Sequence, residues 1–166
     1  ALSLAPRDED ILKNIGLIYL KLGKADLALN YLLRCANLNP DNDEVTLAMG
    51  KSFLALNKYQ NALDCFLKIK DKSLDDDINY FIAMTYGKLN NQGESHYYFG
   101  MYFKKERKND SAFFHFKEAL NYFPPGSDRN NVILNEIKEI NKDNSGGMLR
   151  KPKPKTENGP SFCHCH

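Results

Sequence analysis

The apolar and polar positions of this chain repeat with a fixed spacing over residues 9–76. Gly16 recurs as Gly50, and Ala28 recurs as Ala62, each 34 residues later. Around these positions, large apolar residues return every three or four positions, which is the spacing of a helix with one buried face. A period of this length that contains two such helices is typical of a stacked helical-hairpin repeat, whose units bury their apolar faces against one another.

Short turns rich in glycine, asparagine or aspartate separate the predicted helices. Gly23 and Asn57 occupy corresponding turns, where a left-handed backbone is easily adopted. Asn39-Pro40-Asp41 divides the first two repeats, and an aspartate after it can cap the next helix. We expect eight helices, near 9–22, 25–38, 43–56, 59–70, 76–90, 93–107, 110–123 and 129–141.

The repeated small and large positions resemble the tetratricopeptide repeat (TPR), which has a pair of antiparallel helices per repeat. Small residues at Gly16 and Ala28 would let two helix backbones approach, with Leu32 filling the space beside them. The resemblance implies an all-α fold, a TPR-type right-handed helical solenoid of about eight antiparallel helices with a C-terminal capping helix. The expected organisation is the end of a truncated preceding repeat at 1–8, repeats at 9–42 and 43–75, a third repeat overlapping a partial fourth at 76–124, a capping helix at 125–142 and a disordered tail at 143–166.

Residues 1–6 match residues 35–40 in register, with Pro6 in the place of Pro40. They therefore have the pattern expected at the end of a second helix. We expect the chain to be a piece of a longer protein, in which the front half of this preceding repeat lies upstream.

The predicted helix at 93–107 fits two registers. Ser95, Phe99 and Tyr102 fit the second helix of repeat three, although Tyr102 is large for its position. Gly100 instead fits a first helix, for which Phe116 falls in the matching second helix. The sequence leaves open whether this helix closes repeat three or opens repeat four.

The TPR resemblance also implies where a ligand would bind, because the first helices of the repeats line a concave groove in that family. The groove would be apolar at its base with lysines at its edge, which suits a peptide with hydrophobic anchors. Leu17, Ala48 and Phe81 fall where a carboxylate clamp needs polar or basic residues, so no such clamp is expected. The implied groove residues are Lys13, Leu17, Leu20, Lys21, Leu47, Lys51, Leu54, Tyr80, Met84 and Lys88. Another part of the same protein could equally cover these leucines.

The aromatic density of residues 97–123 exceeds what one core stripe needs. Phe114 lies on nearly the opposite side of its helix from Phe116, and Tyr97 and Met101 are similarly displaced from their neighbours. These three residues either contact neighbouring helices or form a surface for a partner.

Composition narrows the function further. The charged fraction is 27% and the net charge is +2, so there is no basic field of the kind that nucleic-acid binding needs. No stretch approaches 18 apolar residues, so direct membrane insertion is not expected. No motif of a known catalytic centre is present, and His96 and His115 have no adjacent nucleophile, so this fragment is not expected to be an enzyme or to bind a cofactor.

The cysteines do not indicate disulfides. Cys35 occupies a small buried position, and both Cys35 and Cys65 are interpreted as inert thiols. The tail beyond the helices is basic and proline-rich at 150–155. We expect no metal site, and the alternative is a loose one at the four closing residues, Cys163, His164, Cys165 and His166.

A narrower resemblance covers residues 93–140. The segments Gly93–Gly100, Ala112–Phe116 and Pro125–Arg129 are similar to the TPR tail of bacterial periplasmic zinc metalloproteases. This resemblance implies a catalytic domain upstream and a periplasmic location, with a cytoplasmic location otherwise. The prediction is thus a protein–protein interaction module that binds a peptide or partner protein. Its alternative is a substrate-recruiting tail of such a protease, and the sequence indicates no oligomeric state.

Overall fold

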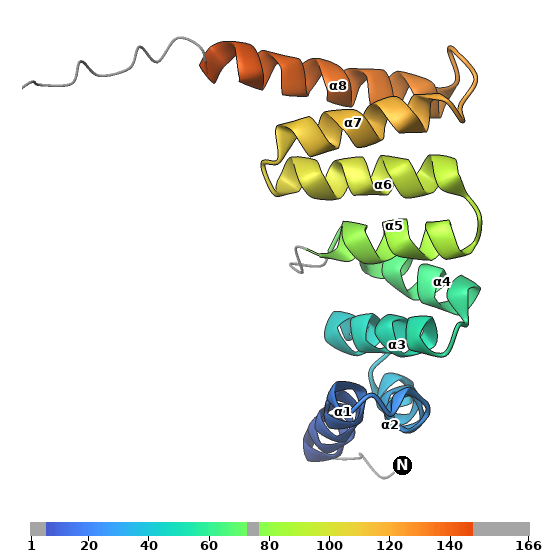
Figure 1. The fold of residues 1–166 in the computed structure, drawn as a ribbon. Helices are drawn as coiled ribbons and strands as arrows, with labels where there is room; N and C mark the ends of the chain where they lie inside the picture. Colours follow the sequence, from blue (N-terminus) through green and yellow to red (C-terminus); the bar gives the residue numbers. More distant parts are fainter. Residues whose placement is uncertain (1–5, 73–76, 148–166) are drawn as a thin grey trace, which may run out of the picture.

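Every regular element in the described part of the chain is an α-helix. The computed structural model describes residues 6–72 and 77–147 (Figure 1). The predicted all-α fold with eight helices is therefore confirmed. The helices are α1 (Pro6–Lys21), α2 (Ala25–Leu38), α3 (Asp43–Ala55), α4 (Tyr59–Ile69), α5 (Ile78–Lys88), α6 (Gln92–Lys105), α7 (Asn109–Leu120) and α8 (Asp128–Gly147).

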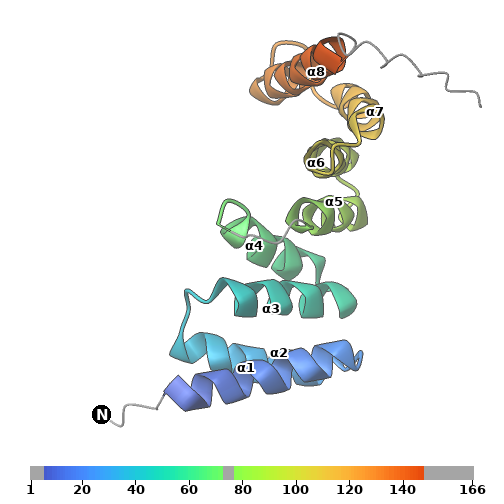
Figure 2. The same ribbon diagram turned by 90° about the vertical axis from the view of Figure 1, so that its left-hand side faces the viewer.

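The helices form one extended stack in which each helix packs on its neighbours in sequence, from α1 on α2 to α7 on α8. In Figure 1 helices α5–α8 are seen side-on, while α1 and α2 are seen nearly end-on. The view turned by 90° reverses this, and α1–α3 now lie lengthwise (Figure 2). The helix direction thus turns along the stack, as in a solenoid. None of the helices in the described ranges has the length and apolar character needed to cross a membrane.

Close approach at glycine holds the helix pairs together. A Cβ atom added at Gly16 would lie 2.7 Å from the side chain of Leu32, and one at Gly100 would lie 2.6 Å from Phe116. Gly50 meets Phe66 in the same way. Because real Cβ atoms do not come this close to other side chains, these positions admit no side chain without movement of the large residue opposite. The packing role predicted for the small residues is confirmed.

Two buried clusters divide the stack. The first joins α1, α2 and α3 and contains Ala28, Leu32, Cys35, Val45 and Ala48. The second runs from α4 to α8 and is richer in aromatic residues, with Phe66, Tyr97, Tyr98 and Phe116 among its buried members. Neither cluster could form from one helical hairpin, so the stability of the fold depends on stacking.

Helix α6 uses both of its registers. Its Ser95 hydroxyl donates to the carbonyl oxygen of Ala83 on α5 at 2.9 Å, in a fully packed position. Its Gly100 faces Phe116 on α7 with the same 16-residue spacing as Gly16 and Leu32. The two interpretations left open by the sequence therefore describe two faces of one helix.

Two ends of the chain differ from the expectation. Pro6 is the first residue of α1, a position that suits proline because its missing N–H has no helical partner there. The rest of the segment expected to end a preceding helix, residues 1–5, lies outside the described residues. The start of the disordered tail, expected at residue 143, is wrong, because α8 continues through Gly147. Glycine lowers helix stability by only about 1 kcal/mol per residue, which does not force a helix to stop.

Candidate peptide-binding groove

Two adjacent hollows lie along α1, α3 and α5. The first has a volume of about 330 Å³ and is lined by Leu17, Leu20, Lys21, Glu44, Leu47, Ala48 and Lys51. The second has a volume of about 440 Å³ and is lined by Leu20, Lys51, Leu54, Ala55, Asn57, Tyr59, Phe81, Met84 and Lys88. Because both share Leu20 and Lys51, the hollows join into one track, which we call the groove.

Helical spacing places the groove residues on one side of each helix. On α3, Leu47, Lys51 and Leu54 follow one another at intervals of four and three residues. Met84 and Lys88 are likewise one turn apart on α5. Residues at such intervals share a helix face, so each helix offers a stripe of apolar side chains and a lysine to the same side of the stack.

The structure brings together eight of the ten residues expected in the groove, and the other two lie beside it. Lys13 forms ion pairs with Glu44 at 3.2 Å and Asp10 at 3.6 Å. Its hydrogen bond to Glu44 raises the pKa of the Lys13 ammonium group. Tyr80 packs against Phe99 and Tyr102 of α6, with ring centroids 5.9 and 5.4 Å apart.

The base of the groove is apolar and its rim is cationic. Leu17 and Ala48 line the first hollow and Phe81 lines the second, as expected for a groove without a carboxylate clamp. The ammonium group of Lys51 lies 4.6 Å from the centre of the Phe81 ring, in a cation–π contact. Lys21 and Lys88 are exposed.

The three residues expected either to contact neighbouring helices or to form a partner surface differ in exposure. Tyr97 is 8% exposed, so its assignment to a partner surface is wrong. The reason is a long-range contact: the Arg129 guanidinium of α8 lies 4.3 Å from the centre of the Tyr97 ring. Met101 is half-buried against the C-terminal core, and Phe114 is 57% exposed.

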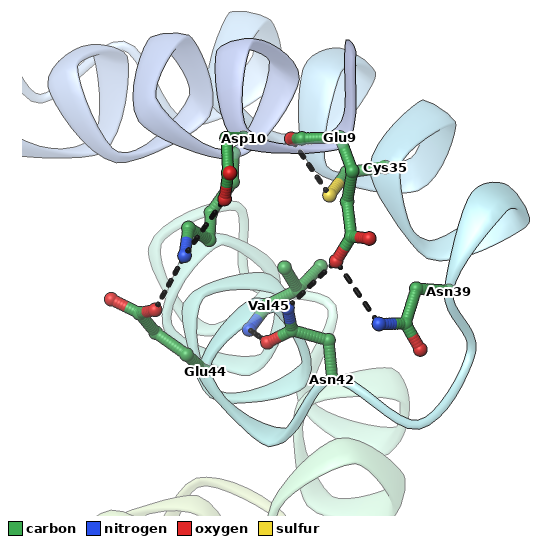
Figure 3. A network of polar contacts seen from close by, with 8 residues as sticks. Glu9, Asp10, Cys35, Asn39, Asn42, Glu44 and Val45 are labelled. Carbon is green, nitrogen blue, oxygen red and sulfur yellow. Dashed lines mark hydrogen bonds and ion pairs between the residues drawn. The ribbon is translucent and has the colours of Figure 1, made fainter. Parts of the chain in front are cut away.

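A polar cluster at the junction of α1, α2 and α3 was not predicted from the sequence (Figure 3). One carboxylate oxygen of Glu9 accepts hydrogen bonds from Asn39 at 3.1 Å and Asn42 at 3.0 Å. Asn42 in turn caps α3 by accepting from the Val45 amide at 3.1 Å. The cluster fixes the N-terminal end of α1, opposite the end that lines the groove, against the turn that starts α3. The cap expected from an aspartate is thus wrong, because Asn42 holds the cap position, and its partner Glu9, 33 residues away, gives no local signal.

The described cysteines are free thiols, in agreement with the sequence interpretation. Cys35 is fully buried, and burial raises its pKa. Burial also raises the pKa of Cys65 to about 11. Both thiols are therefore protonated at neutral pH and unreactive. The expected alternative metal ligands at 163–166 lie outside the described residues.

Comparisons with known proteins agree with this architecture. Residues 10–42 match the family described as tetratricopeptide repeat. The chain is similar to a crystal structure of MamA, at 14% identity, with 89% of this chain and 84% of that chain covered and a TM-score of 0.59. It is also similar to MamA AMB-1, at 17% identity, with 86% and 79% covered and a TM-score of 0.58. No curated protein matches the chain.

At these identities the structural likeness shows the fold alone. The narrower resemblance to periplasmic zinc metalloproteases is not shown by these matches and stays a prediction, as does the location that it implies. The chain carries a tetratricopeptide repeat at residues 10–42 within a TPR-type helical solenoid.

Proposed function

We propose that this chain is a protein-interaction module whose groove binds an extended segment of a partner protein. The observation that carries the proposal is the continuity of the two hollows across α1, α3 and α5 through Leu20 and Lys51. A continuous track along successive helices suits an extended peptide better than a compact small molecule. The partner segment would place apolar side chains on the leucines of the base.

The charges of the groove favour acidic residues in the bound segment. Lys21, Lys51 and Lys88 come from three successive first helices and follow the track. The one carboxylate that lines it, Glu44, is already paired with Lys13 at 3.2 Å. We therefore propose a ligand that combines apolar anchors with flanking acidic side chains. Such charges would select the partner and speed its association more than they would add affinity.

The proposal can be tested with peptides selected from a random peptide library displayed on phage. We expect the selected sequences to be enriched in apolar and acidic residues. The double variant Leu47→Glu/Leu54→Glu should weaken peptide binding at least tenfold in fluorescence anisotropy, because carboxylates would then replace the apolar base. Lys88→Glu, which changes an exposed residue at the rim, should weaken binding of acidic peptides without affecting the fold.

A matched control is available on the second helices. Leu33 and Leu67 are 43% and 36% exposed and do not line the groove, so Leu33→Glu/Leu67→Glu should leave peptide binding unchanged. Circular dichroism melting would confirm that all variants are folded. If the groove variants bind peptide as strongly as the unchanged protein, the groove is not the binding site. The same conclusion follows if no peptide is selected from the library. A failure to select any peptide is expected if another part of the same protein covers the groove.

A further inference from the structure

Helices α6 and α7 bring the two histidines of the described chain together. The Nδ1 atoms of His96 and His115 are 3.1 Å apart, and their ring centroids are 5.3 Å apart. The two residues are 19 positions apart in sequence and form no known motif, so only the packing of α6 on α7 reveals the pair. The groove does not use it.

Aromatic rings hold both imidazoles in place. Phe103 stacks on the His115 ring, with centroids 5.2 Å apart and planes inclined by 14°, and Phe99 lies at the same centroid distance. The Tyr122 ring stacks against His96 at 6.2 Å. Both histidines are partly buried, and their Nδ1 atoms point toward each other. Rings that restrict imidazole rotation reduce the entropy cost of binding a ligand between the two nitrogens.

The separation of the two nitrogens fits metal chelation. Zinc binds imidazole nitrogen at about 2.0–2.1 Å in tetrahedral geometry, which places two ligand nitrogens about 3.3–3.4 Å apart. The observed 3.1 Å is within a few tenths of an ångström of that value. The same distance also suits a hydrogen bond in which one Nδ1–H donates to the other Nδ1. The geometry thus leaves two candidate states, one with a shared proton and one with a shared metal ion.

We propose that His96 and His115 form a two-nitrogen site for a divalent transition metal ion, with water completing the coordination. Imidazole ligands favour zinc, copper and nickel, whereas magnesium and calcium prefer oxygen ligands. No group of three or more metal-ligating side chains occurs among the described residues, so binding should be weaker than at a four-ligand structural zinc site. A bound ion would link α6 to α7. Helix α6 is the one whose sequence fits two repeat registers.

The test is a zinc titration by calorimetry on the full chain at pH 7.5. The background carries Cys163→Ser, His164→Gln, Cys165→Ser and His166→Gln, which removes the other soft ligands near the C-terminus. We expect one zinc ion per chain and a rise in melting temperature with zinc concentration. His96→Gln and His115→Gln should each weaken zinc binding at least tenfold, and Lys117→Gln, at an exposed position of α7, serves as a surface control.

Nuclear magnetic resonance of the imidazole nitrogens gives a second readout that does not depend on a variant remaining folded. Zinc should shift the Nδ1 signals of both histidines in the background protein. Unshifted signals at millimolar zinc would mean that the pair shares only a proton, and the proposal would be wrong. Zinc binding retained in His96→Gln/His115→Gln would place the site elsewhere and would also overturn it.

Discussion

The two ends of the stack follow the same packing rule with different residues. In α1–α4, glycine in the first helix faces a large residue 16 positions later, as in Gly16 with Leu32 and Gly50 with Phe66. In the C-terminal half, Gly100 faces Phe116 at the same spacing. Gly16 and Gly50 are separated by one period. Gly50 and Gly100 are separated by one period plus the length of one further helix.

The difference teaches that the unit that recurs in this fold is the helix pair rather than the 34-residue period. One extra helix lies between the two halves, and α6 packs through Ser95 on one side and Gly100 on the other. The C-terminal half compensates for its irregular register with aromatic side chains, such as Tyr98, which stacks on Tyr86 at 5.6 Å. Burial in this cluster raises the pKa of Tyr98 to about 12.

The largest expected effect is the loss of the large partner in each pair. Phe66 and Phe116 are both fully buried, so Phe66→Ala and Phe116→Ala should each lower the free energy of unfolding by about 3–5 kcal/mol. Urea denaturation followed by circular dichroism measures both losses. Phe114→Ala is the matched control, because that ring is 57% exposed and its removal should cost less than about 0.5 kcal/mol. A small loss at Phe116 would show that the two halves do not share one rule.

A smaller effect is expected from filling the glycine positions. Gly50→Ala and Gly100→Ala would push a methyl group into Phe66 and Phe116, and each should destabilise the protein by about 1–3 kcal/mol. Gly87→Ala is the control on α5, because its nearest neighbour would be the Ser95 hydroxyl at 3.3 Å. The gain in helix propensity there, about 1 kcal/mol, is offset in part because the buried Ser95 hydroxyl must give way, so the loss of stability should be smaller than at Gly50 or Gly100. Thermal melts would separate the two classes, and a stabilising Gly100→Ala would refute the α6–α7 pairing.

These contrasts explain which parts of the fold and of the groove could be predicted from the sequence. Periodicity located the helices, and the TPR resemblance placed most of the groove residues, such as Leu47, Lys51 and Leu54, which share one face of α3. Periodicity could not place Tyr97, whose burial depends on Arg129 of α8, 32 residues later. Similarly, the contact of His96 with His115 depends on how two helices rotate against each other, which no pattern within either helix specifies.

The smallest effect concerns the asparagines that cap helices in the two halves. Asn42 caps α3 at 3.1 Å and Asn91 caps α6 at 3.3 Å, each by accepting from a backbone amide. Asn42 also donates to Glu9 at 3.0 Å, whereas the contact of Asn91 is exposed and local. Asn91→Ala should therefore cost about 0.5–1 kcal/mol, and Asn42→Ala about 1–2 kcal/mol.

A double-mutant cycle isolates the source of that difference. Glu9→Ala should lower stability by itself and should lower it less when Asn42→Ala is already present, with a coupling of about 0.5 kcal/mol or more. Glu9→Ala and Asn91→Ala, which lie in different halves, should be additive. If the two asparagine variants cost the same and Glu9 couples to neither, the polar junction does not stabilise α1 against α3. The regular half would then be held by its apolar pairs, such as Gly16 with Leu32 and Gly50 with Phe66.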